Sequence, residues 1–205
     1  PNLSDLTRFD SARTDEFETP SPDLDPEHFV SYELGIKADG ENAAAQVACY
    51  YTDIDGMIVR TPTGREIDGN HEVTKKNAGN GYVQGVELDA SYRLGSNLSA
   101  FGAFTWMDGR VKTYPTSEAK LTEEYIDRLM PPTGRLGLRW NQNRKYWAQA
   151  SCTLADRADR LSTRDKADTS RIPQGGTPGY IVNDIRTGWN PTDNQALSLA
   201  MENIT

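Results

Sequence analysis

The sequence predicts an all-β chain of the antiparallel up-and-down transmembrane-barrel class. Three observations lead to this prediction: apolar and polar residues alternate in several windows, short and long connections follow one another regularly, and aromatic residues lie near the short connections. Alternation with a period of two is typical of strands whose two faces meet different surroundings. We therefore expect about eight strands, arranged as about four hairpins.

The alternation is strictest in four stretches, in which every second residue is apolar and the residues between them are polar or small. These stretches are 30–38, 86–94, 136–140 and 197–201. The stretch 180–189 fits less well, because the face that carries its large apolar side chains also carries Asn183 and Thr187. Each stretch has the length of a strand that crosses a bilayer or one side of a soluble sandwich.

The connections between these strands favour the barrel over the sandwich. Turn-forming residues mark the short connections at 39–42, 95–97, 141–145 and 190–194. The long connections span 56–80, 108–130 and 157–179. Repeated structureless loops of about 20 residues are uncommon in a compact soluble domain. In an outer-membrane barrel they are expected on the extracellular side, with the short turns on the periplasmic side.

Aromatic residues lie where the edges of a bilayer would be. Close to the short turns are Tyr92, Trp140, Trp189 and either Tyr146 or Trp147. Trp106, together with Tyr50 or Tyr51, lies about nine residues from a short turn, which matches a tilted transmembrane strand. Because aromatic rings favour the interface between lipid and water, this spacing predicts two aromatic girdles.

Composition excludes several other classes. Only 36% of the residues are hydrophobic, and no stretch approaches the roughly 18 apolar residues that a transmembrane helix needs. The net charge is -8 and no basic block is present, so nucleic acid is not an expected partner. Cys49 and Cys152 lie too far apart to suggest a disulfide framework or a zinc site. The chain opens on Pro1 without a recognisable targeting segment.

Five segments resemble, in the same order, motifs of the C-terminal half of the barrel of TonB-dependent receptors. They are Pro1-Asn2-Leu3-Ser4-Asp5-Leu6, Pro22-Asp23-Leu24-Asp25-Pro26-Glu27, Ser31-Tyr32-Glu33-Leu34-Gly35-Ile36-Lys37, Asn77-Ala78-Gly79 with Gly85-Val86-Glu87-Leu88-Asp89, and Leu199 to Thr205 with Glu202-Asn203-Ile204-Thr205. Singly each motif is weak, but together they extend over nearly the whole chain. The resemblance implies that residues 1–205 are the C-terminal portion of such a barrel, with the plug domain and the final strand absent.

The same resemblance implies a function and a location. Such a receptor lies in the bacterial outer membrane and takes up a scarce nutrient, such as an iron–siderophore or a related iron complex. The expected partners are outer-membrane lipid, the nutrient ligand, and the TonB complex acting through the missing N-terminal plug. No enzymatic activity and no cofactor are expected. The boxes resemble most those of haem and transferrin-type iron receptors, yet residues 3–22 lack the histidine that ligates haem there.

The candidate ligand-binding residues are cations in the long connections: Arg60, Arg110, Lys112 and Arg164. Their charge-assisted hydrogen bonds would suit an anionic iron chelate, although any single loop cation is more often a solvated surface charge. The carboxylates Glu33, Glu87 and Asp89 alternate with the apolar residues. We expect them to face water or to pair with neighbouring cations, and not to act in catalysis.

Two classes of alternative remain open at this stage. A soluble all-β ligand- or carbohydrate-binding module would show the same alternation, but it would have to bury its apolar faces against each other. An outer-membrane barrel enzyme or a simple porin is the other alternative. The enzyme is disfavoured because no Ser/His/Asp grouping is recognisable, and the porin because the chain carries the receptor-like motifs.

Overall fold

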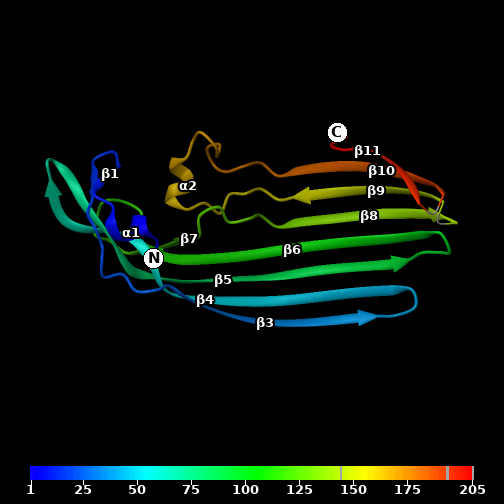
Figure 1. Cartoon of the computed structure of the whole chain (residues 1–205), viewed down its shortest axis with the longest axis horizontal. Helices are drawn as coiled ribbons and strands as arrows, with labels where there is room; N and C mark the ends of the chain where they lie inside the picture. Colours follow the sequence, from blue (N-terminus) through cyan, green and yellow to red (C-terminus); the bar gives the residue numbers. More distant parts are fainter. Residues whose placement is uncertain (144, 193, 205) are drawn as a thin grey trace.

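The computed structural model describes residues 1–143, 145–192 and 194–204. Arg144 and Asp193, in two expected turns, and Thr205, in the last motif, lie outside the described residues. The eight long strands are β3 (His28–Asp39), β4 (Ala43–Ile67), β5 (Asn70–Arg93), β6 (Leu98–Thr113), β8 (Thr133–Gln142), β9 (Tyr146–Ala155), β10 (Tyr180–Thr192) and β11 (Gln195–Met201). Each pairs antiparallel with the next, and β3 and β11 form the edges of an open sheet (Figure 1). The predicted up-and-down order is confirmed.

The short connections gather at one end of the sheet, which we call the turn end; the opposite end is the loop end (Figure 1). At the turn end, neighbouring hairpins are also joined to each other by backbone hydrogen bonds. The N–H of Arg93 donates to the carbonyl of Asn42 at 2.6 Å, that of Asn141 to Asn97 at 2.8 Å, and that of Asn190 to Lys145 at 2.8 Å. These bonds satisfy backbone groups that leave the regular ladders.

The expectation of a loop at 56–80 is wrong. β4 and β5 stay paired as far as Ile67 and Asn70, where Asp68 and Gly69 turn the chain with φ of +49° and +79°. Positive φ at both central residues is the requirement of a type I′ two-residue hairpin turn, and Asp-Gly is a common sequence for it. The connection is therefore a tall hairpin that rises beyond the rest of the sheet (Figure 1).

The other two long connections are also built rather than structureless. In the first, β7 (Thr122–Tyr125) turns back and pairs with the upper part of β6. In the second, the short helix α2 (Thr163–Ala167) lies between β9 and β10, and Ala158 forms an isolated bridge with Thr177. These additions bring polar side chains from different connections into contact.

The N-terminal segment covers the tall hairpin. It contains α1 (Leu3–Thr7), β1 (Asp10–Arg13) and β2 (Glu16–Glu18). β2 pairs in parallel with residues 71–73 of β5, above the point where β5 pairs with β6. An exposed strand edge is thereby closed. The few buried apolar side chains lie mainly in this part of the molecule, with Val73 fully buried and Val59 and Val111 nearly so.

The sheet separates its side chains into an apolar and a polar face, as the alternation predicts. One register row on the apolar face consists of Ile36, Val47, Leu88, Phe104, Gly134, Leu154 and Ile181. The large side chains of this face are widely exposed; Leu34, for example, is 74% exposed. No second sheet packs against this face within the described residues. A soluble sandwich would bury it, so the structure contradicts that alternative.

The register also resolves which aromatic residues share the apolar face. Tyr146 lies there and stacks on Trp189 with ring centroids 6.4 Å apart, whereas Trp147 lies on the polar face across Gly188. Tyr51, not Tyr50, is on the apolar face. The part of the chain that the structure describes contains no helix that is long and apolar enough to cross a membrane.

The polar residues of β10 that fitted poorly do lie on the apolar face. Asn183 is opposite Cys152 and Thr187 is opposite Ala148 in the register. The Thr187 hydroxyl donates to the carbonyl of Trp147 at 2.9 Å, and the Asn183 amide to that of Ile204 at 3.4 Å. Because their donors are satisfied locally, these side chains cost less in an apolar environment than the sequence suggests.

Candidate functional site

The loop end carries all four candidate ligand-binding cations, but it uses them differently. Arg60, on the extension of β4, is almost buried: its side chain is 10% exposed. It forms an ion pair with Glu16 of β2 and donates to the carbonyls of Tyr114 and Thr116 at 2.9 and 2.8 Å. The Ser117 hydroxyl also donates to Glu16, at 2.6 Å. Arg60 therefore joins the N-terminal segment, the tall hairpin and the connection after β6.

Arg110 and Lys112 lie two residues apart on β6 and so share one face of the strand. The Arg110 guanidinium lies over the Tyr125 ring, 3.6 Å from its centroid. Such cation–π contacts hold a guanidinium in place while leaving its edge able to donate hydrogen bonds. Lys112 is exposed, opposite Glu123 of β7 in the register. These two cations form a small basic strip beside β7.

Arg164 is on α2, and its side chain is 73% exposed. The helix begins at Ser162, whose hydroxyl accepts a hydrogen bond from the Asp165 N–H at 3.0 Å. This Ser-x-x-Asp pattern is a helix-start signal that the sequence already contains. Arg164 forms an ion pair with Asp127, which lies just after β7, at 3.0 Å. α2 is thus held towards β7, and Arg164 comes from a different connection than Arg110 and Lys112.

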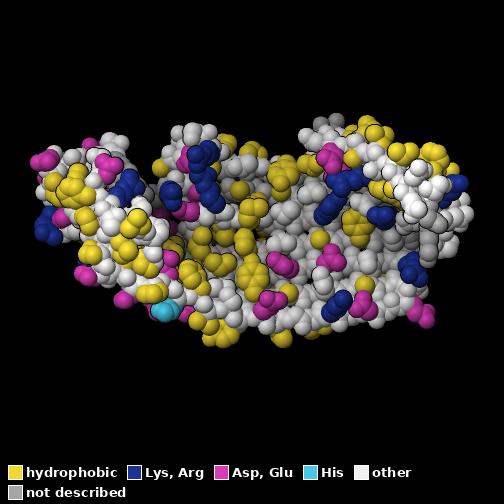
Figure 2. Space-filling view, in the orientation of Figure 1, with side chains coloured by type: hydrophobic (Ala, Val, Ile, Leu, Met, Phe, Trp, Pro, Cys, Tyr) yellow, Lys and Arg dark blue, Asp and Glu magenta, His cyan; other side chains and the backbone are white. Residues whose placement is uncertain are grey.

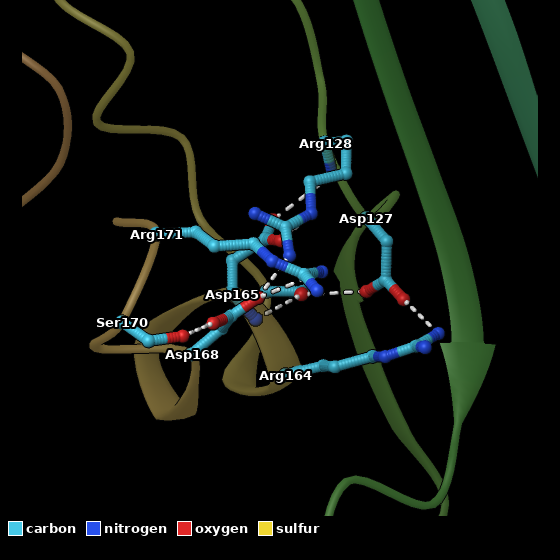
Figure 3. A network of polar contacts seen from close by, with 8 residues as sticks. Asp127, Arg128, Arg164, Asp165, Asp168, Ser170 and Arg171 are labelled. Carbon is cyan, nitrogen blue, oxygen red and sulfur yellow. Dashed lines mark hydrogen bonds and ion pairs between the residues drawn. The ribbon is translucent and has the colours of Figure 1, made fainter.

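Three residues that sequence reasoning did not single out form the centre of this region (Figure 3). Asp165 is only 1% exposed, and its carboxylate accepts a hydrogen bond from the Arg128 N–H at 3.0 Å. The Arg128 guanidinium forms ion pairs with Asp165 and Asp168. Arg128 and Asp165 are 37 residues apart in the sequence, and only the fold brings them together.

Asp168 has an altered acidity. Hydrogen bonds from the Ser170 hydroxyl and the Arg128 guanidinium lower the pKa of the Asp168 carboxyl below its usual value, and the charge of Arg171 acts in the same direction. Hydrogen bonds and nearby positive charge both favour the ionised carboxylate. Asp168 therefore stays negative over the whole neutral range and remains a permanent partner for Arg128.

The polar face of the sheet is divided by charge. Figure 2 looks onto this face, where acidic side chains gather over β3 to β5 and basic ones over β8 to β10. Glu33, Glu87 and Asp89 line one shallow hollow together with Lys37. All three carboxylates are exposed, which confirms the expectation that they face water. Lys37 forms its ion pair with Asp39, at 3.7 Å.

On the basic side, aromatic rings and neighbouring side chains support the arginines. Arg139 lies 4.8 Å from the ring centroid of Trp147. Arg135 donates to the Ser151 hydroxyl at 3.0 Å, and Arg186 pairs with Glu202 at 2.5 Å. Within residues 1–143, 145–192 and 194–204, no group of three His, Cys, Asp or Glu side chains is placed to hold a metal ion.

Comparison with known proteins identifies the family to which this architecture belongs. Residues 1–204 match the family model described as TonB dependent receptor-like, beta-barrel. The search of curated proteins returns no match. Several solved structures share the fold over 90% or more of this chain.

The copper transporter OprC shares 18% identity with a TM-score of 0.72 over 100% of this chain and 29% of its own. The FrpB iron transporter from Neisseria meningitidis (F3-3 variant) shares 21% identity with a TM-score of 0.67 over 92% of this chain and 28% of its own. The G324V mutant of the ferric enterobactin receptor PfeA from Pseudomonas aeruginosa shares 16% identity with a TM-score of 0.66, over 92% and 27%.

The chain therefore spans less than a third of each of these proteins. At such identities the likeness to solved structures concerns the fold, while the family model carries the assignment. The open sheet, whose eight long strands have one apolar face and loop-end extensions, is a part of a larger barrel wall. The chain belongs to the TonB dependent receptor-like β-barrel family, whose members are transporters of the bacterial outer membrane.

Proposed function

We propose that this chain is the C-terminal part of the barrel of an outer-membrane receptor that takes up a scarce nutrient, an iron–siderophore or related iron complex, with energy from the TonB system. The family match over residues 1–204 carries this proposal. The three similar structures are named as a copper transporter, an iron transporter and a ferric enterobactin receptor. The plug domain, the TonB contact and the final strand would belong to the remainder of the protein. No catalytic step is part of the proposal.

The apolar face would lie against outer-membrane lipid. The aliphatic and aromatic side chains of this face are exposed in this chain. Contact with lipid would avoid the free-energy cost of exposing them to water. The loop end would then face the outside of the cell and the turn end the periplasm. The polar face would line the interior of the barrel.

We place the ligand contacts at the loop end, on Arg110, Lys112 and Arg164. Because Arg110 and Lys112 share the side of β6 that carries Phe104, they would meet the ligand beyond the lipid-covered part of the sheet and not inside the barrel. Lys112 and Arg164 are exposed, and Arg110 is presented by the ring of Tyr125. All three supply donors for an anionic metal chelate. The Arg60 guanidinium already binds Glu16 and two carbonyls. Arg60 would therefore not contact the ligand, but would hold together the N-terminal segment, the tall hairpin and the connection after β6.

The proposal is tested on the whole protein, expressed with its upstream and downstream sequence in a bacterium that lacks its own iron receptors. A membrane-fraction band that shifts on boiling first verifies that the barrel has closed. We expect growth under iron limitation on ferric siderophores, and loss of that growth when the host lacks TonB. A folded barrel that supports TonB-dependent growth on none of a set of ferric siderophores contradicts the proposed cargo. Parallel assays with copper and haem then identify another one.

The site is tested by replacing its cations. Lys112→Ala and Arg110→Ala remove charge-assisted hydrogen bonds worth about 1.5–3 kcal/mol each when made to a ligand. We expect each variant to raise the apparent Kd for the chelate about tenfold or more. The control is Lys120→Ala, an exposed cation of the same connection that lies outside the basic strip. Equal effects of Lys120 and Lys112 replacement would mean that only general charge attracts the ligand.

A further inference from the structure

Two adjacent residues of opposite charge, Asp127 and Arg128, connect the segment after β7 to α2 (Figure 3). Asp127 accepts a hydrogen bond from the Ser162 hydroxyl at 2.6 Å and pairs with Arg164 at 3.0 Å. These contacts hold the first turn of α2. Glu124 of β7 also holds this turn, accepting a hydrogen bond from the Thr163 N–H at 3.3 Å.

Arg128 makes the complementary contacts. Its backbone N–H donates to Asp165 at 3.0 Å, its Nε lies 3.4 Å from the other carboxylate oxygen of Asp165, and its guanidinium also pairs with Asp168. The negative residue 127 thus meets a positive residue of α2, and the positive residue 128 meets negative ones. A shift of one residue between the two segments would bring like charges together, so the arrangement fixes their register.

The backbone at Arg128 is strained in this position. Its φ is +61°, in the left-handed region that non-glycine residues rarely adopt. Such conformations persist only where the surrounding contacts over-determine them. Asp165 supplies that restraint, but one of its buried oxygens, Oδ1, has no hydrogen-bond partner. The pairs are therefore held together by charge and burial and not by a fully satisfied network.

Few apolar contacts support α2. The helix has five residues, and Asp165 is the one that is buried among them. The base of the connection is held separately by Arg160, which donates to the carbonyls of Met107 and Met130 at 2.6 and 3.0 Å and lies 3.5 Å from Asp108. The polar contacts of α2 and those of Arg160 are therefore made by different residues.

We propose that Asp127 and Arg128, together with α2, form a polar latch at the loop end. In the closed state, which this structure shows, the latch holds α2 against the segment after β7 and sets the position of Arg164. In the open state, the charge pairs separate, the backbone of Arg128 relaxes, and α2 swings about the base that Arg160 holds. The latch rests on these contacts alone; its part in ligand capture rests also on the proposed function.

Hydrogen exchange in the whole protein, in native outer-membrane vesicles, tests the latch. Arg128→Gln should raise the exchange rate of the amides of α2 about tenfold or more, while β9 keeps wild-type rates. The matched control is Arg171→Gln, whose side chain is 77% exposed and whose ion pair with Asp168 spans 3.7 Å; it should leave α2 unchanged. Wild-type exchange in Arg128→Gln contradicts the latch, and so does faster exchange that extends over β9.

A charge swap tests the other half. Asp127→Arg and Arg164→Asp should each speed up exchange in α2, and the double variant should return it towards the wild-type rate. A double variant that exchanges as fast as the single ones contradicts the latch. Ligand affinity is measured on Arg128→Gln, which keeps the proposed ligand contact Arg164: faster exchange without a change in Kd removes the role in ligand capture and keeps the latch. Failure of uptake by the wild type concerns the receptor proposal alone.

Discussion

On the apolar face of β8, Leu136 and Leu138 are 63% and 48% exposed, whereas at the loop end the carboxylates of Glu16 and Asp165 are 3% and 1% exposed. The sheet exposes apolar side chains, whereas the loop end buries some of its charged ones. The difference fits the proposed placement, in which the sheet meets lipid and the loop end meets water. In lipid, apolar exposure costs nothing and every backbone group must pair within the sheet.

At the loop end, short segments of low apolar content have to be held by particular side chains. Arg60 with Glu16 joins the N-terminal segment to the tall hairpin, and Arg128 with Asp165 joins α2 to the segment after β7. A strand ladder tolerates most side-chain changes, because its hydrogen bonds come from the backbone. A buried carboxylate such as Glu16 or Asp165 does not tolerate the loss of its cation, because it is then an uncompensated charge.

The largest expected effect is therefore at the loop end. Arg60→Met should destabilise the N-terminal segment by about 3–5 kcal/mol, because it leaves Glu16 buried without its cation. Limited proteolysis of the whole protein should then cut within residues 1–21 while the sheet stays resistant. The double variant with Glu16→Gln should recover much of that loss. A single variant as resistant as the wild type would show that the pair does not hold this segment.

Substitution by arginine in the sheet should lower the folding stability strongly on the apolar face only. Leu138→Arg places a charge on the apolar face and should cost about 2–4 kcal/mol of folding free energy in lipid vesicles, if this position lies near the middle of the bilayer. Thr105→Arg is the matched control, because Thr105 is on the polar face opposite Glu87. It should cost much less. Equal costs for the two arginines would overturn the assignment of faces.

The smallest expected effect is that of pH on the latch. The pKa of Asp168 is lowered in the folded protein, so its contribution is fully present above the unfolded value near 3.8 and is lost as pH falls through the lower, folded value. Pepsin cleavage of the 156–179 connection, relative to Asp168→Asn, should be slower at pH 4.5 and should converge with that variant as pH falls well below 3.8. A constant ratio would mean that Asp168 does not stabilise the connection.

Much of the sheet could be read from the sequence because a period of two is a local property. The alternating stretch 86–94 lies in β5 and its turn, and 30–38 lies in β3. The tall hairpin was missed although Asp68-Gly69 is a clear turn signal, because proline, glycine and charged residues around Arg60 and Arg65 have the composition of a loop. Pairing with a neighbouring strand and the cover of β2 overrode that local composition.

For the candidate site, too, the sequence predicted one part and the fold decided the other. Charge and loop position were enough to select Arg110, Lys112 and Arg164 as exposed or presented cations, but not to separate them from Arg60, which the fold buries. Nor did the sequence mark Arg128 or Asp165. Neither periodicity nor charge distinguishes these residues from solvated loop charges, since burial depends on which segments meet.

The eight long strands, their order and the two faces of the sheet could be predicted from the sequence, because side-chain alternation and turn residues act over a few positions of the chain. Which loop charges are buried in ion pairs and which are exposed depended on how distant segments come together in the fold. Electrostatic pairing acts through space and strengthens steeply with burial, so Arg60 and Arg128 acquire their roles from residues that lie far away in the sequence.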